Sequence, residues 1–358
     1  MPIARISYTE EDAWRDLPIL LGAAGLNESL KNEAELLHYN QNSLFRIPSL
    51  GIVMRNVRPN PLAAGRAKRV AKLGEYFRQS SAPTVRLADG FTQPINVGDL
   101  WATIWNEEER RPKDQIKGRH MGSALKAFHE IDISVPELAA LPRWQNPLAD
   151  SKSRIRQGFT KELITKEEYE KLIALMDELE RDIRIVRQQL EKMFTLLHGD
   201  PQIANLLFRD DEPIWCDFDS TMIGPSQADL AVTAVNAIRF NKSERHKQAA
   251  AAYGQDVMQD EHWDLFRRMR EAKLIASNIL NLKDHPAIRP EFEKRYRSVF
   301  EEGNEIWIPY TEAKENYDSE NPGWLDQQAS TQTAAKVTAD AARRPRPDCR
   351  RPRNPRPR

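Results

Sequence analysis

The sequence predicts an α+β fold of two lobes, a β-rich first third followed by a mainly helical remainder. Three observations support this: extended apolar segments concentrate in residues 1–107, a polar stretch without periodicity follows at 106–113, and helical periodicity dominates from there. We therefore expect an N-lobe at 1–107, a C-lobe at 108–317 and a disordered Arg- and Pro-rich tail at 318–358. A chain of 358 residues is long enough for one large domain or two medium ones.

The composition is that of a protein with a substantial core, because 40% of the residues are hydrophobic and 30% are charged. No run of 18 apolar residues is present, and the N-terminus lacks the apolar stretch of a signal peptide. Two cysteines, Cys216 and Cys349, do not indicate a disulfide framework. We expect a cytoplasmic protein without a membrane partner.

The formal net charge of zero conceals an uneven distribution. Residues 341–358 contain eight Arg and one Asp, a net charge of +7, which leaves −7 on the rest of the chain. An acidic body favours a cationic substrate by long-range attraction, although ordinary surface charge is the simpler explanation. Basic tails of this kind are usually solvated, so no nucleic-acid partner is expected.

The first third contains clear strand and helix signals. Residues 44–57 predict two strands around a turn at Pro48–Gly51, and residues 93–105 predict a hairpin with its turn at Gly98. A helix is expected from Ala63 to Gln79. These elements make up the predicted N-lobe.

The remainder is mainly helical. Thr165 and Glu168 form a capping box that opens a long helix, in which apolar residues recur at spacings of three and four up to Leu190. After Asp229 the chain returns to helices up to about Trp307. Only residues 193–219 interrupt this pattern, with three short apolar strands.

These short strands carry the polar residues that indicate chemistry. His198-Gly199-Asp200 follows the first strand, Asn205 opens the second, and Asp217 and Asp219 follow the third. Phosphoryl transfer needs a carboxylate to orient or accept the proton of the substrate hydroxyl, and hard oxygen ligands for Mg²⁺. Asp200 supplies the first of these, and Asn205 and Asp217 supply the second. Asp210 and Asp211 are explained as incidental acids of a turn. Asp200, Asn205 and Asp217 are not, because they cluster at the ends of apolar strands.

The motif His198-Gly199-Asp200-x-x-x-x-Asn205, followed by Asp217-Phe218-Asp219, resembles the aminoglycoside phosphotransferase and choline kinase superfamily, which has the protein-kinase-like fold. The resemblance implies that Asp200 is the catalytic base and that Asn205 and Asp217 bind the metal. It also implies that Asp229, within Asp229-Leu230-Ala231, braces the catalytic loop. We interpret His198 as part of that scaffold rather than as a base.

The N-lobe adds weaker matches to the same superfamily. Gly51-Ile52-Val53-Met54-Arg55 resembles its third strand, so Arg55 is expected to contact the ATP phosphates. The hinge falls near 103–107, where Trp105 lines the nucleotide pocket or belongs to the core. The loop over the phosphates is Asn40-Gln41-Asn42-Ser43, which lacks glycine, and Ser43 is our candidate there.

The C-terminal half and one departure complete the resemblance. Arg270-Glu271 to Asn278 resembles a helix common in bacterial members. The superfamily usually pairs the strand-three base with a Glu, but no acid occurs near Val70, where that Glu is expected. Glu75 is the only carboxylate in that helix, so the partner of Arg55 stays open.

The sequence therefore predicts an ATP- and Mg²⁺-dependent phosphotransferase that acts on a hydroxyl of a small molecule, of the aminoglycoside, choline-like, amino-alcohol or sugar class. Asp217-Phe218-Asp219-Ser220-Thr221 also fits the D-x-D-x-T signature of haloacid-dehalogenase-type phosphatases, which is the first alternative. A kinase-like binding protein without catalysis is the second. The oligomeric state is left open.

Overall fold

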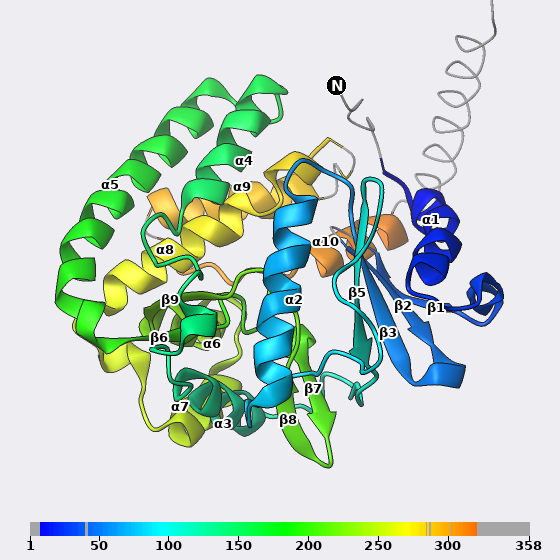
Figure 1. The fold of residues 1–358 in the computed structure, drawn as a ribbon. Helices are drawn as coiled ribbons and strands as arrows, with labels where there is room; N and C mark the ends of the chain where they lie inside the picture. Colours follow the sequence, from blue (N-terminus) through cyan, green and yellow to red (C-terminus); the bar gives the residue numbers. More distant parts are fainter. Residues whose placement is uncertain (1–7, 40–41, 284, 286–287, 302, 321–358) are drawn as a thin grey trace, which may run out of the picture.

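The computed structural model describes residues 8–39, 42–283, 285, 288–301 and 303–320. Nearly all of the predicted tail therefore lies outside the described residues. The N-terminal part is a five-stranded antiparallel sheet in the order β1-β2-β3-β5-β4 (Figure 1). Its strands are β1 (Glu35–Tyr39), β2 (Asn42–Ile47), β3 (Ile52–Val57), β4 (Ile95–Val97) and β5 (Leu100–Asn106).

Both predicted strand pairs are present. A short 3₁₀ turn at Pro48–Leu50 joins β2 to β3, and Gly51 follows it with a φ of 60°, a conformation that glycine adopts without a steric penalty. Gly98, with a φ of 56°, turns the chain between β4 and β5. The hairpins bring strands from residues 42–57 and 95–106 into one sheet.

The sheet has a helix on each face. The sequence reasoning did not predict α1 (Glu10–Ala23), which begins with a capping box between Thr9 and Asp12. Its apolar face packs on one side of the sheet, in a cluster that includes Leu17, Phe45 and Met54. The other face of the sheet lies against α2 (Ala63–Gln79). The residue range of α2 is the predicted one.

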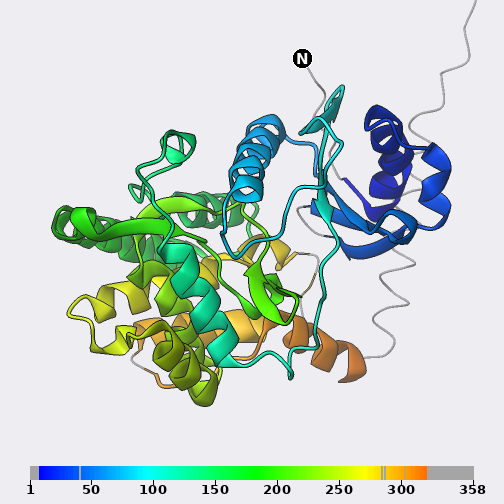
Figure 2. The ribbon, with the colours of Figure 1, turned by 60° about the horizontal axis from the view of Figure 1, so that its bottom comes forward.

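Helix α2 belongs to both parts of the molecule. Its residues Val70, Leu73 and Phe77 are part of the large buried cluster of the helical portion. Figures 1 and 2 show α2 between the sheet and the helices that follow it. The two lobes are therefore joined by packed side chains as well as by the chain itself.

The chain leaves the sheet at the end of β5 and crosses to α3 (Gly118–His129). On the way, Glu109 exchanges two backbone hydrogen bonds with Phe208, at N–O distances of 3.1 and 2.9 Å. Phe208 lies in β7 (Leu206–Arg209), the strand that begins directly after Asn205. This crossing segment is thereby fixed to the part of the C-lobe that carries the site.

The remainder is mainly helical, with two small antiparallel sheets that pair β6 with β9 and β7 with β8. Its other strands and helices are as follows: α4 (Ala149–Thr160), α5 (Lys166–Leu190), β6 (Phe194–Leu197), β7 (Leu206–Arg209), β8 (Glu212–Trp215), β9 (Met222–Pro225), α6 (Gln227–Arg239), α7 (Ser243–Tyr253), α8 (Trp263–Ala276), α9 (Arg289–Phe300) and α10 (Tyr310–Glu320).

Two sequence predictions can be compared directly with these helices. The capping box at Thr165 and Glu168 opens α5 as predicted. The helices do not end near Trp307, because α10 follows and runs past the expected lobe boundary at 317.

The two-lobed α+β fold is confirmed. None of the helices among the described residues is both long and apolar enough to cross a lipid bilayer.

Candidate active site

The candidate catalytic loop begins where β6 ends, with a fully buried histidine. The Nε2–H group of His198 donates to the carbonyl oxygen of Cys216 at 2.9 Å. Its Nδ1 atom accepts from the backbone N–H of Asp200 at 3.3 Å. Both ring nitrogens are thus engaged with backbone groups, and His198 has no free nitrogen with which to accept a substrate proton. This geometry suits a scaffold.

Asp229, in the first turn of α6, holds the same loop from behind. Its carboxylate accepts from the backbone N–H of His198 at 2.7 Å and from that of Gly199 at 3.0 Å. His129 at the end of α3 lies 3.2 Å from the same carboxylate. Asp229 is 1% exposed, so these partners replace its water and orient the loop.

Gly199 is required by both its backbone conformation and its surroundings. Its φ is 85°, and a Cβ atom built there would lie 2.2 Å from the carbonyl oxygen of Ser220. Ser220 follows Asp219, so Gly199 is the point where the loop after β6 and the loop after β8 meet. Only glycine lets these two backbones approach so closely.

Asp200 is the accessible carboxylate of this loop, with 37% of its side chain exposed. The side-chain amide of Gln202 donates to both carboxylate oxygens, at 2.7 and 3.0 Å. Nη1 of Arg270, from α8, lies 3.7 Å from one of them. Asp200 is therefore held in place by flanking donors while its carboxylate stays open to a substrate.

Asn205 and Asp217 are linked through the backbone, and both carry side-chain oxygens without a hydrogen-bond partner. The Asn205 side-chain amide donates to the carbonyl oxygen of Asp200 at 3.0 Å, which leaves its Oδ1 atom available. The Asn205 carbonyl oxygen accepts from the N–H of Cys216, the residue before Asp217. The Asp217 carboxylate has no hydrogen bond or ion pair within the described part of the chain.

These oxygens fit a divalent cation of the Mg²⁺ type. Oδ1 of Asp219 is also buried without a partner, so a third hard oxygen is available nearby. Among the described residues, no three His, Cys, Asp or Glu side chains form a metal-binding group. A site of two carboxylates and one amide suits Mg²⁺, which keeps several waters and shares its remaining ligands with phosphates.

The electrostatics at Asp217 are consistent with this donor set. Solvent reaches the residue, yet the protein around its carboxyl removes part of its hydration. This desolvation raises the pKa of Asp217, and the nearby Asp219 adds to the rise, whereas Arg55 opposes it. Asp217 also has a φ of 66°, an uncommon conformation for a residue with a side chain. A bound cation would favour the charged carboxylate.

The N-lobe contributes Arg55, which pairs with the second acid of the Asp217-Phe218-Asp219 segment. Nη2 of Arg55 lies 2.5 Å from Oδ2 of Asp219, and the Asn42 side-chain amide donates to the same oxygen at 3.1 Å. Arg69 of α2 donates to the Asp219 carbonyl oxygen at 2.9 Å. In this structure Asp219 is therefore the partner of Arg55 that the sequence left open.

Two of the predicted nucleotide residues, Ser43 and Trp105, are not brought together with Arg55. Ser43 is 1% exposed and shares a face of β2 with Phe45, toward α1 and away from Arg55. The neighbouring Asn42 points to the other face, because side chains alternate along a strand. Asn42 therefore lies on the same side of the sheet as Arg55, and both contact Asp219, whereas Ser43 does not.

Trp105 faces the core rather than an open pocket. It is 6% exposed, and its indole N–H donates to Oγ1 of Thr103 at 2.8 Å. Its ring contacts Phe218, between the two acids, at a centroid distance of 5.9 Å. Phe218 also contacts Phe77 of α2 at 4.8 Å and His198 at 6.0 Å. Of the alternatives weighed for Trp105, its side chain occupies the core, within an aromatic cluster that joins both lobes.

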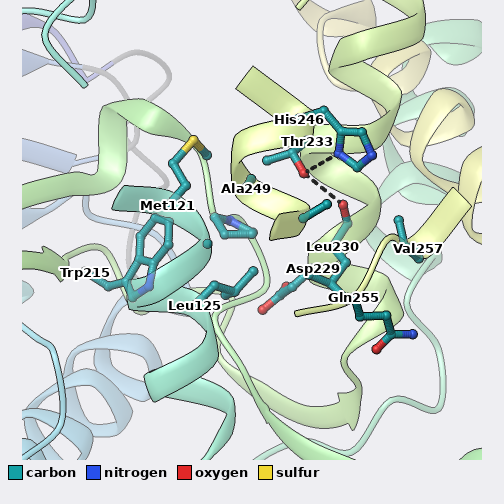
Figure 3. A pocket seen from close by; sticks show the side chains of 13 residues that line it. Met121, Leu125, Trp215, Asp229, Leu230, Thr233, His246, Ala249, Gln255 and Val257 are labelled. Atoms are coloured by element: carbon teal, nitrogen blue, oxygen red, sulfur yellow. Dashed lines mark hydrogen bonds between the residues drawn. The ribbon is translucent and has the colours of Figure 1, made fainter. Parts of the chain in front are cut away.

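A cavity lies behind the catalytic loop, between α3, α6 and α7 (Figure 3). Its lining includes Asp229, Leu125 and the hydrogen-bonded pair Thr233 and His246. Only about 10 Å³ is open to the centre of a water molecule, which is room for one water at most. We therefore assign it to the packing of the C-lobe and not to a substrate.

Solved structures with this fold include three small-molecule kinases. The amicoumacin kinase hAmiN, in complex with AMP-PNP, Ca²⁺ and Ami, is 12% identical with a TM-score of 0.58, covering 86% of this chain and 99% of that one. A spectinomycin phosphotransferase in complex with ADP and spectinomycin is 13% identical with a TM-score of 0.52, and the match covers 78% of this chain and 92% of that one. A choline kinase from Cryptosporidium parvum is 14% identical with a TM-score of 0.52, and the match covers 80% of this chain and 90% of that one. At these identities the likeness establishes the fold.

The sequence comparison defines the class. No curated protein matches the chain significantly. The sequence model of the phosphotransferase enzyme family matches residues 52–271, which run from β3 through the catalytic loop into α8. The chain belongs to this family. The predicted superfamily and the enzyme class, a phosphotransferase with an alcohol group as acceptor, are confirmed.

Proposed function

We propose that this protein transfers the γ-phosphoryl group of ATP, with Mg²⁺, to a hydroxyl group of a small molecule. One observation supports this most strongly: Asp200, Asn205 and Asp217 are brought together with open oxygen atoms. Asn205 bonds the backbone of Asp200 and the backbone next to Asp217. A base and two metal ligands thereby share one small region.

Each residue has a role in the proposed reaction. The substrate oxygen attacks the γ-phosphorus, the bond from phosphorus to the bridging oxygen breaks, and ADP leaves. The hydroxyl proton passes to Asp200, which is accessible and positioned by Gln202. Asn205 and Asp217 would hold Mg²⁺, which supplies positive charge to the phosphates. His198 and Asp229 keep the loop in the required shape.

On the nucleotide side, we assign Arg55 to the ATP phosphates. Its guanidinium is nearly buried, and its Nη1 atom has no partner. Buried donors without partners are costly, so a phosphate oxygen would complete its hydrogen bonding. Asn42 and Arg69 surround the same acid and are further candidates for this subsite. The hinge near 103–107, which leaves the sheet at the end of β5, is proposed to lie beside the adenine.

We propose the class of the phosphoryl acceptor from the names of similar structures. Kinases of this fold act on spectinomycin and choline, according to the names of the similar structures. We extend this to an aminoglycoside, choline-like, amino-alcohol or sugar acceptor, phosphorylated in the cytoplasm without a nucleic-acid partner. The lobes at 1–107 and 108–317 are proposed as the nucleotide and acceptor sides respectively.

The phosphatase alternative is not supported by the fold. A D-x-D-x-T phosphatase needs alternating strands and helices around its acids. Here Asp217 follows a two-stranded antiparallel hairpin, and every sheet among the described residues is antiparallel. Asp219, which would be the acid/base, is instead bound by Arg55.

The decisive experiment measures ADP release and phosphorylated product with a panel of hydroxylated metabolites and antibiotics, for the wild type and for Asp200→Asn. Asn keeps the size of Asp but cannot take the proton. We expect kcat to fall about 10²- to 10⁴-fold with the affinity for ATP unchanged. A variant as active as the wild type would remove Asp200 from the mechanism. A wild type that binds ATP but transfers nothing would support the non-catalytic alternative.

A further inference from the structure

Helix α8 presents two cations toward the catalytic loop. Arg270 and Lys273 are three residues apart and therefore lie on one side of the helix. Nη1 of Arg270 is 3.7 Å from the Asp200 carboxylate, a distance longer than a direct charge-assisted hydrogen bond. Arg270 is thus close to the proposed base without being fully engaged by it, and Lys273 lies one turn further along the same side of the helix.

Neither cation is satisfied by the protein around it. The Arg270 side chain is 12% exposed, and its Nε atom is buried without a partner. Lys273 makes no hydrogen bond or ion pair within the described residues. Desolvation, with the neighbouring Arg270, lowers the pKa of Lys273 to about 8. Two enclosed cations of this kind are costly unless an anion accompanies them.

Asp229, Asp200 and Asp150 are the carboxylates that act on Lys273 electrostatically, and none of them forms an ion pair with it among the described residues. Asp229 accepts from the backbone of the catalytic loop and lies beside His129. Glu271, next to Arg270 in sequence, pairs with Arg239 at 2.7 Å and with Arg267 at 2.9 Å, on another side of the helix. Asp200 is shared with Gln202. Gln202 and backbone N–H groups carry no charge, so Asp200 and Asp229 keep theirs, yet neither carboxylate saturates the donors of Arg270 and Lys273.

From this arrangement we propose that Arg270 and Lys273 form an oxyanion subsite, and that the phosphoryl acceptor is a small hydroxylated molecule carrying a carboxylate or a phosphate. This inference rests on the proposed kinase function and narrows its substrate class. An anion held by α8 would place the rest of the molecule at Asp200, where its hydroxyl loses a proton. The same cations would repel a polycationic aminoglycoside or choline. This repulsion by Arg270 and Lys273 would act against the attraction expected from the acidic body.

Matched acceptor pairs test the substrate class. Hydroxy acids are compared with their amides, and sugar phosphates with the free sugars, alongside an aminoglycoside and choline. We expect higher kcat/KM for the anionic member of a pair, and the two kinds of pair distinguish carboxylate from phosphate. Faster transfer to the amide, the free sugar or the cationic acceptors would overturn the inference and leave the kinase function standing. Absence of all transfer, with ATP still bound, would count against both.

The variant Lys273→Met tests the subsite itself. We expect the acceptor KM to rise about tenfold or more, with kcat and the ATP KM nearly unchanged, because an anchoring contact is lost rather than a reacting group. Arg268→Met is the matched control, since Arg268 lies on the same helix but pairs with Glu178 at 2.8 Å. An unchanged acceptor KM in Lys273→Met would sink the inference.

A binding measurement does not depend on finding the acceptor. Calorimetry with saturating Mg·ADP, which fills the nucleotide side, can follow inorganic phosphate and acetate as separate probes. We expect weak binding of at least one of them to the wild type, and its loss in Lys273→Met but not in Arg268→Met. If neither anion binds, or if both variants bind them like the wild type, Arg270 and Lys273 are not an oxyanion subsite.

Discussion

Arg55 pairs with Asp219 of the C-lobe and not with an acid of α2, where the resemblance places a Glu. The helix that usually supplies a Glu carries Arg69 next to Val70 instead, and this Arg bonds the backbone of Asp219. The carboxylate that accompanies Arg55 comes from the loop after β8 in the C-lobe. Phosphates arriving at Arg55 would therefore compete with Asp219, whose carboxylate would become free to approach the metal.

Arg55→Ala should raise the KM for ATP about 10- to 100-fold, with a much smaller effect on the acceptor KM, because a charge-assisted hydrogen bond to phosphate is lost. Steady-state kinetics with each substrate varied in turn provides the measurement. Arg46→Ala is the control, since Arg46 lies in the neighbouring strand and forms more exposed ion pairs with Glu107 and Glu35. Equal effects of the two variants would show that Arg55 has no special role at the phosphates.

The loops after β6 and β8 act together as one element of the site. Their backbones approach most closely at Gly199 and Ser220, and the Phe218 ring packs beneath them against His198. Asp229 fixes one loop through two backbone hydrogen bonds. The positions of Asp200 and Asp217 therefore depend on each other through this contact.

Gly199→Ala should disrupt both activity and stability, because the new methyl group would collide with the carbonyl oxygen of Ser220. A displacement of about 1 Å at the base can cost about 10²-fold in rate, so we expect kcat to fall by that order. Gly254→Ala is a matched control: its φ is 95°, but nothing lies within 4 Å of the added Cβ.

In that control only backbone strain is introduced, about 1–2 kcal/mol, and activity should be retained. Thermal unfolding and kcat are measured for both variants. If Gly199→Ala behaves like Gly254→Ala in both respects, the close approach of the two loops is not needed for function.

The formal net charge of the whole chain is zero, yet one desolvated cation, Lys273, affects the free energy of unfolding. The pKa of Lys273 falls from 10.5 to about 8 in the folded state, so between these values the unfolded chain binds more protons. Stability must then rise with pH through this window. Below about pH 8 the full destabilisation by Lys273 is present.

Lys273→Met should therefore be more stable than the wild type at pH 7, by an amount on the order of 1–3 kcal/mol. This advantage should shrink as the pH approaches 10, where Lys273 is neutral in the folded protein. Urea unfolding of both proteins at pH 7 and at pH 9.5 provides the comparison. An advantage of the same size at both values would contradict the lowered pKa.

The basic segment at the C-terminus is the other feature that concerns the entire chain. Residues 330–358 lie outside the described residues, and their Arg- and Pro-rich composition offers little apolar surface to bury. Deleting them should leave the thermal midpoint and the turnover nearly unchanged. A clear fall in the midpoint would show that the segment docks on the body.

The sequence alone determined the parts of this protein that depend on local pattern. Strand alternation and turn residues predicted the hairpins of the sheet, the capping box predicted the start of α5, and a short motif with fixed spacing predicted the order of Asp200, Asn205 and Asp217. These features depend on neighbours in sequence, so a single sequence carries them. The same reasoning missed α1, although Thr9 and Asp12 form a capping box there.

Only the tertiary structure decided which distant side chains meet. Arg55 and Asp219 are 164 residues apart, and neither residue type identifies the other as its partner. Whether Ser43 or Asn42 lies on the Arg55 side of the sheet depends on the register, which is fixed because Phe45 is buried against α1. The sequence predicted a helix at Arg270, but its distance of 3.7 Å from Asp200 follows from the packing of α8 beside the catalytic loop. Such contacts arise from packing between elements, for which local sequence patterns hold no signal.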